Sequence, residues 1–408
     1  MTTRRALLSL LPTTLAGCTV LDRGGTSPDS SGTRTFSWPS VNATPENTRT
    51  IPNGRLDELQ PDPQTTYPAD EVGINGSNAR APVVDDEAVI LVAPGESDDD
   101  GCLVTCFEPD GHDWLDVTWQ RELEHAFPDG AATIVDDLVL VTVSNESGIE
   151  PDTDAGLVAL SMSDGETLWS YPLEDGPALT PTAKNGIAYM RTATGVIAVD
   201  IETGDREWRD DASTIEHPWQ HHTHTEHFAP AVDEGRVYVS GGGELTVYDH
   251  NGAHQWGIEL TDVEGGPAVD HGMIYICAGN ELYALDAVGG RSEWTEENVR
   301  SIGPAVGDDE VVVSDGNRVL ALDPGDGSTH WQTDNILQGS AVFSPSIVGE
   351  TIVASSPSTI VGLTRSDGDQ RWELKSEATR WHQTIADGRV YHFCRNGDSG
   401  YQLRIYDK

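Results

Sequence analysis

Hydrophobic and polar residues alternate with a period of two along most of the chain, in short runs separated by Gly- and Asn-containing turns. The stretch from Gly235 to Trp256 is typical. Two alternating runs, Arg-Val-Tyr-Val-Ser and Glu-Leu-Thr-Val-Tyr-Asp, flank three glycines, and a glycine turn then leads to the Trp. Such alternation predicts half-buried β-strands joined by tight turns. A Pro-containing segment before the runs, such as Gly266-Pro-Ala-Val, predicts one more short strand.

This unit repeats along the chain. Six copies carry a Trp four residues after the Gly of the turn, and a divergent first copy runs from Pro82 to Trp119. A last copy begins at Gly388 and stops at Asp407, before its Gly and Trp. Successive Trp positions are 50, 39, 48, 38, 37 and 41 residues apart, close to the length of a four-stranded blade. We therefore expect an all-β fold, with residues 36–408 forming a single eight-bladed β-propeller of four-stranded antiparallel blades. The tryptophans expected to pack between blades are Trp119, Trp169, Trp208, Trp256, Trp294, Trp331 and Trp372.

The truncated last copy leaves its blade one strand short, and an unpaired strand edge invites aggregation. Trp38, in Thr35-Phe-Ser-Trp, has no repeat of its own. The pattern predicts that an N-terminal strand containing Trp38 completes the last blade and closes the ring.

The spacing Ala-Leu-Asp-x-x-x-Gly-x-x-x-Trp, seen at Ala284–Trp294 and Ala321–Trp331, resembles the repeat of the pyrroloquinoline-quinone (PQQ) propeller family. This family includes quinoprotein alcohol dehydrogenases and the outer-membrane assembly lipoprotein BamB. The resemblance covers roughly residues 36–408. It implies the fold with high specificity and says little about function.

In the quinoprotein dehydrogenases, the resemblance implies a cofactor on the propeller axis beside a disulfide between adjacent cysteines. It also implies calcium held by acidic and amide side chains, with an Asp as base. This chain has five cysteines and no two are adjacent, and no residue matches a cofactor ligand. We therefore expect no PQQ and no catalytic residues.

The N-terminus predicts export. Arg4-Arg5 precede a short apolar stretch that ends in Leu15-Ala-Gly-Cys18. This pattern predicts a twin-Arg signal peptide over residues 1–17 whose cleavage leaves Cys18 to carry a lipid. Residues 18–35, rich in Gly, Ser, Thr and Pro, predict a flexible tether. The expected location is the outer face of the cell membrane.

Charge narrows the range of partners. Asp and Glu total 68 against 24 Lys and Arg, so the net charge is −44. A field of this sign repels nucleic acid, so we expect no nucleic-acid partner. The spread of acids with few Lys resembles the surfaces of proteins from extremely halophilic archaea.

Two groups of residues raise the question of further chemistry. Cys106 falls five residues before the Gly of its turn, where other copies have residues such as Leu160, and this predicts a buried side chain.

The segment between Trp208 and Pro230 is longer than its counterparts and is rich in His. In an extended chain, His222, His224 and Glu226 would point to one side and could hold Zn or Cu. A polar loop between blades is the simpler interpretation. The candidate ligands are His222, His224, Glu226 and His227.

Taken together, these features predict a non-catalytic, lipid-anchored propeller that serves as a protein-binding or assembly scaffold, with a partner still to be identified. Two alternatives remain open: a PQQ-dependent oxidoreductase, and a propeller that binds solutes or polysaccharide.

Overall fold

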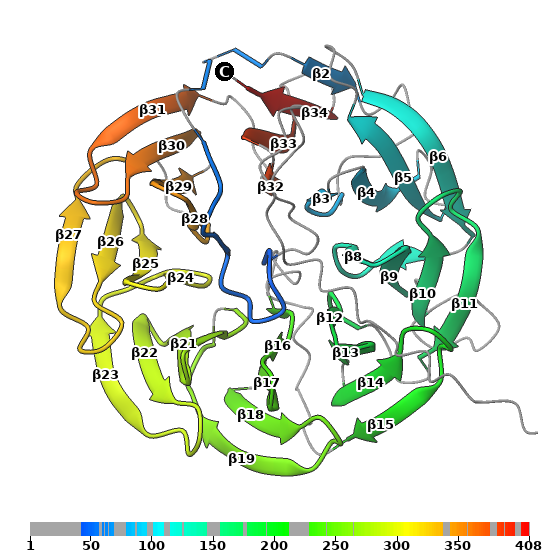
Figure 1. The fold of residues 1–408 in the computed structure, drawn as a ribbon, viewed down its shortest axis with the longest axis horizontal. Coiled ribbons are helices and arrows are strands. Elements are labelled where there is room, and N and C mark those ends of the chain that lie inside the picture. Colours follow the sequence, from blue (N-terminus) through cyan, green and yellow to red (C-terminus); the bar gives the residue numbers. More distant parts are fainter. Residues whose placement is uncertain are drawn as a thin grey trace, which may run out of the picture. The chain divides into compact units, whose positions relative to one another are not determined.

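The computed structural model describes most of residues 42–407. The gaps lie at 57–58, 61, 64, 69–78, 86–87, 96–100, 110–114, 125, 145–155, 174–177, 193, 212–227, 242, 264, 338–342, 357, 376–381, 387 and 396–400. Residues Thr35–Lys408 form one compact unit. Within it, eight β-sheets stand around a common axis as an eight-bladed propeller (Figure 1). Among the described residues, no helix is long and apolar enough to cross a membrane.

Each blade is an antiparallel sheet that runs from an inner to an outer strand. Blade 1 contains β3 (Val83–Val84), β4 (Val89–Pro94), β5 (Cys102–Pro109) and β6 (Leu115–Leu123). Blade 2 contains β7 (Phe127–Pro128), β8 (Thr133–Val135), β9 (Leu138–Ser144), β10 (Gly156–Ser161) and β11 (Thr167–Pro172). Blade 3 contains β12 (Thr182–Lys184), β13 (Ile187–Arg191), β14 (Val196–Asp200) and β15 (Arg206–Asp210). Blade 4 contains β16 (Ala231–Val232), β17 (Arg236–Gly241), β18 (Glu244–Asp249) and β19 (His254–Glu259).

The second half follows the same plan. Blade 5 contains β20 (Ala268–Asp270), β21 (Met273–Ala278), β22 (Glu281–Asp286) and β23 (Ser292–Glu297). Blade 6 contains β24 (Ala305–Gly307), β25 (Glu310–Asp315), β26 (Arg318–Leu322) and β27 (Thr329–Thr333). Blade 7 contains β28 (Ser346–Val348), β29 (Thr351–Ser356), β30 (Thr359–Thr364), β31 (Gln370–Lys375) and the parallel addition β1 (Thr50–Ile51). Blade 8 contains β32 (His382–Ala386), β33 (Arg389–Arg395), β34 (Tyr401–Tyr406) and β2 (Thr65–Pro68).

The core lies between blades, because both faces of a middle strand are buried. Most of the hydrophobic clusters join residues of neighbouring blades, such as Val92 and Val104 of blade 1 with Val141 and Val158 of blade 2. A sheet of this kind cannot cover both of its faces alone, so each blade depends on the next.

The repeated Trp residues join successive blades, as the sequence predicts. In six cases the ring lies against the turn Gly of the next blade, as Trp294 does against Gly327. In five of these cases the indole N–H also donates to a carbonyl of that blade at 2.8–3.0 Å, for example Trp294 to Pro324. Trp372 differs, because the eighth copy ends before its Gly; its ring lies over Gly362 of its own blade.

The strand register corrects the expected position of Cys106. A bulge interrupts the pairing of the two outer strands in each of the first seven blades, and Cys106 lies directly before it, opposite Trp119. The counterpart of Cys106 is therefore Ala159, which lies opposite Trp169, and not Leu160. The predicted burial of Cys106 is confirmed, since it is 3% exposed.

An N-terminal strand does close the ring, but its predicted identity is wrong. The outer neighbour of β34 is β2, with Thr66 opposite Arg404 and Tyr67 opposite Leu403. Trp38 lies outside the described residues. β2 takes this position because the preceding chain first crosses from the axis to the periphery, burying Leu56 and Leu59 on the way.

Candidate functional site

The axis of a propeller is the usual place to look for a ligand, and here part of it is occupied by the chain itself. The segment Asn42–Ile51 runs along the inner strands of blades 4 to 7 (blue in Figure 1). Its carbonyl groups accept hydrogen bonds from one inner-strand N–H in each of these blades, at 2.8–3.1 Å. The pairs are Val232 to Pro45, Val269 to Glu46, Val306 to Thr48 and Ile347 to Arg49. These four N–H groups are therefore already satisfied.

Side chains hold this axial segment in place. The Asn47 amide donates to the Ala229 and Pro267 carbonyls at 2.8 and 3.1 Å, so it bridges two blades. The buried Arg49 guanidinium donates to the Pro345 carbonyl at 2.9 Å and to Asn42 at 3.0 Å. Burial lowers the pKa of Arg49 to about 10, so it stays protonated at neutral pH.

One ion-pair group ties the segment to blades 3 and 4. Lys184 pairs with Glu46 of the axial segment and, at 3.1 Å, with Glu234 of the turn after β16. Burial acts to lower the pKa of Lys184, but the hydrogen bonds and charges of the two carboxylates outweigh it and raise that pKa. Sequence analysis missed this whole segment because it lies outside the repeat.

Four of the five cysteines lie in the described part of the chain. Cys102, Cys106, Cys277 and Cys394 are all buried thiols. Burial raises the pKa of Cys106 and Cys394 to about 11, and raises that of Cys102 further. Because the thiolate is the reactive form, burial makes Cys102, Cys106 and Cys394 unreactive at neutral pH.

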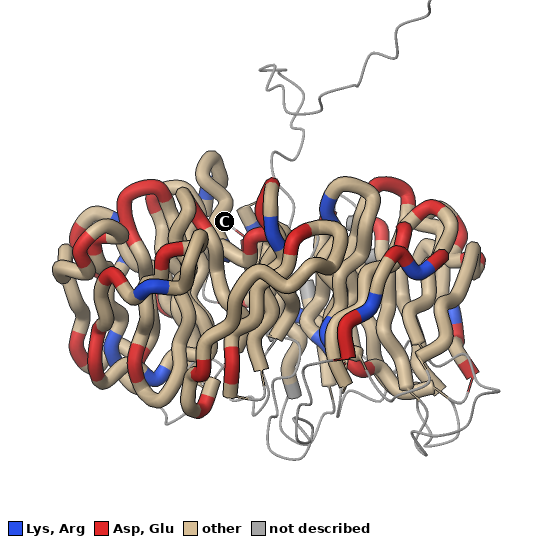
Figure 2. Tube along the Cα trace, turned by 90° about the horizontal axis from the view of Figure 1, so that it is seen from below, with Lys and Arg blue, Asp and Glu red and all other residues tan. Residues whose placement is uncertain are grey.

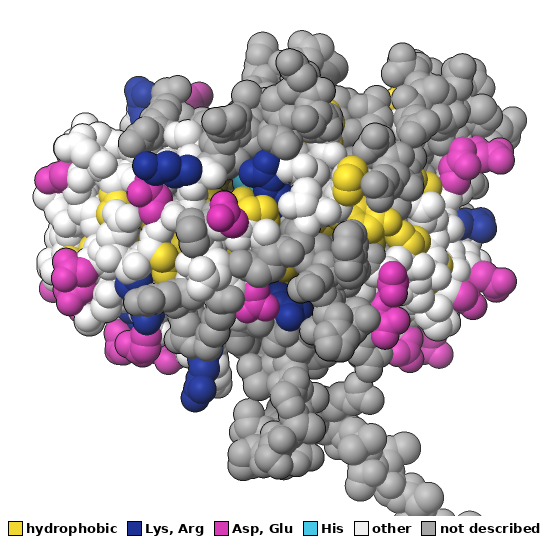
Figure 3. Space-filling model, turned by 90° about the horizontal axis from the view of Figure 1, so that it is seen from above, with side chains coloured by type: hydrophobic (Ala, Val, Ile, Leu, Met, Phe, Trp, Pro, Cys, Tyr) yellow, Lys and Arg dark blue, Asp and Glu magenta, His cyan; other side chains and the backbone are white. Residues whose placement is uncertain are grey.

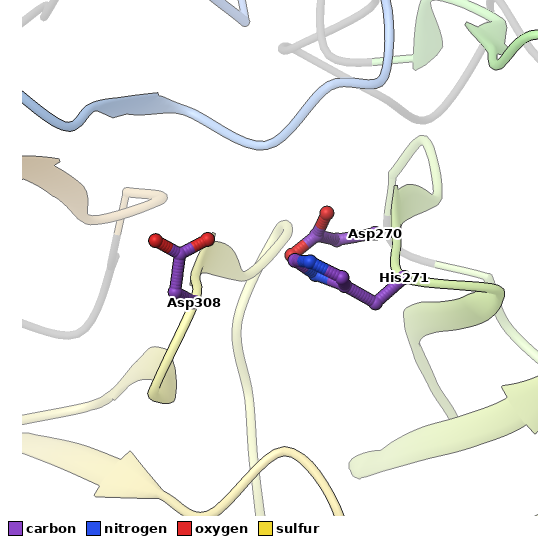
Figure 4. A group of neighbouring side chains, drawn as sticks. All are labelled: Asp270, His271 and Asp308. Carbon is purple, nitrogen blue, oxygen red and sulfur yellow. The ribbon is translucent and has the colours of Figure 1, made fainter.

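The predicted metal ligands His222, His224, Glu226 and His227 lie outside the described residues, as does Cys18. One other group in the described part of the chain has suitable donor atoms (Figure 4). His271 Nδ1 lies 2.7 Å from Asp270 Oδ2, and donor atoms of these residues and Asp308 lie within 4.8 Å of one another.

His271 and Asp308 occupy matching turn positions in blades 5 and 6, so the radial packing of the repeats brings them together. Sequence analysis missed the pair because they are 37 residues apart, although the repeat alignment contains the signal. The His271 ring is 72% exposed and its Nδ1 already interacts with Asp270. The hydrogen bond and charge of Asp270 raise the pKa of His271. We therefore interpret Asp270, His271 and Asp308 as a solvated cluster of charged side chains.

The rest of the charge is distributed widely. Acidic residues lie mainly on the turns at the two rims of the blades (Figure 2). Figure 3 shows acidic side chains spread over the visible side and not gathered in one patch.

Solved structures support the fold. BamB from Moraxella catarrhalis matches with a TM-score of 0.61 and 18% identity, over 84% of this chain and 96% of that one. Quinohemoprotein alcohol dehydrogenase from Comamonas testosteroni matches with a TM-score of 0.62 and 12% identity, over 92% and 81%. The computationally designed Ika8 protein matches with a TM-score of 0.61 and 15% identity, over 84% and 99%. At these identities the likeness concerns the fold alone.

A comparison with curated protein sequences gives no match. A family model, in contrast, matches residues 100–262 and 241–392, most of the propeller. Its description is outer membrane protein assembly factor BamB. The expected PQQ-type repeat is thus confirmed, and the chain belongs to the BamB-like family of PQQ-repeat β-propellers.

Proposed function

We propose that this protein is a non-catalytic binding scaffold, held at the outer face of the cell membrane by a lipid on Cys18, with another protein as its partner. Membership in a family described by an assembly factor supports this role. The same fold occurs in quinohemoprotein dehydrogenases, so the fold alone does not choose between the two activities.

The observation that carries the proposal is the axial segment, which occupies part of the axis along blades 4 to 7. A planar quinone on the axis needs hydrogen-bond donors and open space beside the inner strands. Here the axial segment uses one inner-strand N–H in each of blades 4 to 7, and the Asn47 amide uses the carbonyl groups of Ala229 and Pro267. These interactions link blades to one another, which suits a rigid scaffold.

The described cysteine thiols also support a non-catalytic role. A catalytic cysteine needs a lowered pKa and access to solvent. The four described cysteines are buried, and for Cys102, Cys106 and Cys394 burial raises the pKa.

Cross-linking of the lipidated protein in native membranes tests the proposal. Only three residues are Lys while 68 are acidic, so a carboxyl-reactive cross-linker has far more attachment points than an amine-reactive one. We expect one additional protein in near-stoichiometric amount. Once purified, that protein should bind the isolated propeller reversibly.

The control experiment tests for the alternative function, PQQ-dependent oxidation of an alcohol. Purified protein is titrated with PQQ and Ca²⁺ while absorbance and alcohol-dependent dye reduction are followed, and we expect neither to change. Stoichiometric PQQ binding with dye reduction would contradict the scaffold role and support a PQQ-dependent oxidoreductase instead. Cross-linked products containing only copies of this chain would also contradict the proposal.

A further inference from the structure

Arg191 is a buried cation at the seam between blades 3 and 4. It is the last residue of β13, close to Gly241 at the end of β17 in the next blade. The residue is 1% exposed. Its Cζ lies 5.5 Å from the centre of the Phe228 ring, directly over the ring.

Gly241 covers part of the same guanidinium. A Cβ at this position would collide with Cζ, Nη1 and Nη2 of Arg191 at once, so the glycine backbone lies against the flat face and not against an edge. Only a residue without a side chain leaves room for the guanidinium here. The contacts with Gly241 and Phe228 use the faces of the group and leave its N–H donors unused.

Nε, Nη1 and Nη2 of Arg191 are buried, and among the residues that the structure describes none of the three has a hydrogen-bond acceptor. Arg49, the other fully buried arginine described above, donates to Pro345 and Asn42. Burial lowers the pKa of Arg191 to about 10, while the charge of Glu244 acts to raise it. Arg191 is therefore protonated at neutral pH, and within the described part of the chain no carboxylate forms an ion pair with it.

A buried charge with no partner is strongly unfavourable, so folded structures pair such groups. A guanidinium presents its N–H groups in a planar fork that matches a carboxylate in two parallel hydrogen bonds. We propose that Arg191 is the anchor of a binding site for a small monocarboxylate solute at the seam of blades 3 and 4. The site does not depend on the scaffold role proposed above.

Charge selects the class of ligand. Arg191 supplies a single positive charge, Glu244 lies near enough to affect its pKa, and the chain carries a net charge of −44. A monoanion neutralises one guanidinium, whereas a dianion such as sulfate leaves a second negative charge in a field that repels it. The planar fork and the apolar Phe228 ring favour a carboxylate over a spherical halide.

Thermal unfolding of the whole chain tests this site, with sodium acetate replacing sodium chloride at a fixed sodium concentration and therefore a fixed ionic strength. Acetate bound by the folded state should raise the melting temperature of the wild type by about 2 °C per tenfold increase above its dissociation constant. Arg191→Met should abolish this increase. Without acetate this variant should be at least as stable as the wild type, because it removes an unpaired buried charge.

Two further variants separate binding from general effects of salt. Arg318→Met removes the same charge from a partly buried ion pair with Asp315 in blade 6, away from Arg191, and should keep the full response to acetate. Arg191→Lys keeps the charge but loses the fork, and should weaken the response. The proposal is overturned if acetate acts equally on the wild type and Arg191→Met, or if chloride acts as strongly as acetate. It is also overturned if Arg191→Met is less stable at every acetate concentration, since the guanidinium would then have a partner within the chain.

Discussion

Leu56 lies where the N-terminal segment crosses from the axis to the periphery, and its replacement tests how the ring is closed. Leu56 is 2% exposed and belongs to a cluster that joins residues of blades 7, 8 and 1, including Val353, Tyr391 and Leu91. The hydroxyl of Thr351 also donates to the Leu56 carbonyl at 2.9 Å, which fixes the backbone there. Leu56→Ala therefore leaves a cavity in the seam while keeping this hydrogen bond.

The expected cost follows from general values. A buried Leu→Ala replacement lowers the free energy of unfolding by about 2–5 kcal/mol. For a unit the size of Thr35–Lys408, the entropy of unfolding is about 0.8 kcal/mol per kelvin, so the melting temperature should fall by about 3–6 °C. Leu168→Ala is the matched control, because Leu168 is 54% exposed on β11 and should cost at most about 0.5 kcal/mol.

Differential scanning calorimetry of the two variants decides the matter. If Leu56→Ala melts at the same temperature as Leu168→Ala, then the packing of the crossing segment does not stabilise the closed ring. The reasoning from the buried seam would then be wrong.

Four other outcomes are expected. Gly327→Ala should cost about 1–3 kcal/mol in chemical denaturation, because its φ of 73° disfavours a side chain and a Cβ would lie 2.8 Å from the Trp294 ring; wild-type stability would contradict this. Burial raises the pKa of Asp129 to about 7 from an ordinary 3.8, so its contribution to stability is fully present below about pH 4 and is lost as the pH rises through 7. Asp129→Asn should therefore flatten the dependence of melting temperature on pH in this window, and an unchanged slope would disprove it. Melting temperature should rise from about 0.1 to 2 M KCl, because screening relieves the self-repulsion of a net charge of −44; a flat or falling curve would contradict this. Cys18→Ser should leave the protein folded but release it from membranes on fractionation, and unchanged retention would refute lipidation at this residue.

The sequence by itself determined the number of blades, their four-stranded antiparallel plan and the contacts of six of the seven repeated tryptophans. These features depend on interactions within one repeat or between adjacent repeats, which the spacing of Gly, Asp and Trp encodes directly. The burial of Cys106 could be predicted for the same reason. Its register could not, because 119 − 106 = 13 residues separate Cys106 from the paired Trp119 while 169 − 159 = 10 separate Ala159 from Trp169, so the connection between the two outer strands is longer in blade 1 and counting from Gly111 misplaces Cys106 by one position.

The rest was decided by tertiary structure. Thr50 pairs with Ile347 and Thr66 with Arg404, across nearly the whole chain, and no repeat period specifies such partners. The segments that contain Thr50 and Thr66 have no repeat of their own, so only the shape of the assembled ring selects which residues line its axis and which complete its last blade. Arg191 shows the same limit: its position at the end of a strand follows from the repeat. Its guanidinium is buried with no hydrogen-bond partner in the described part of the chain, and this depends on Gly241 and Phe228, which the packing of the next blade places against it.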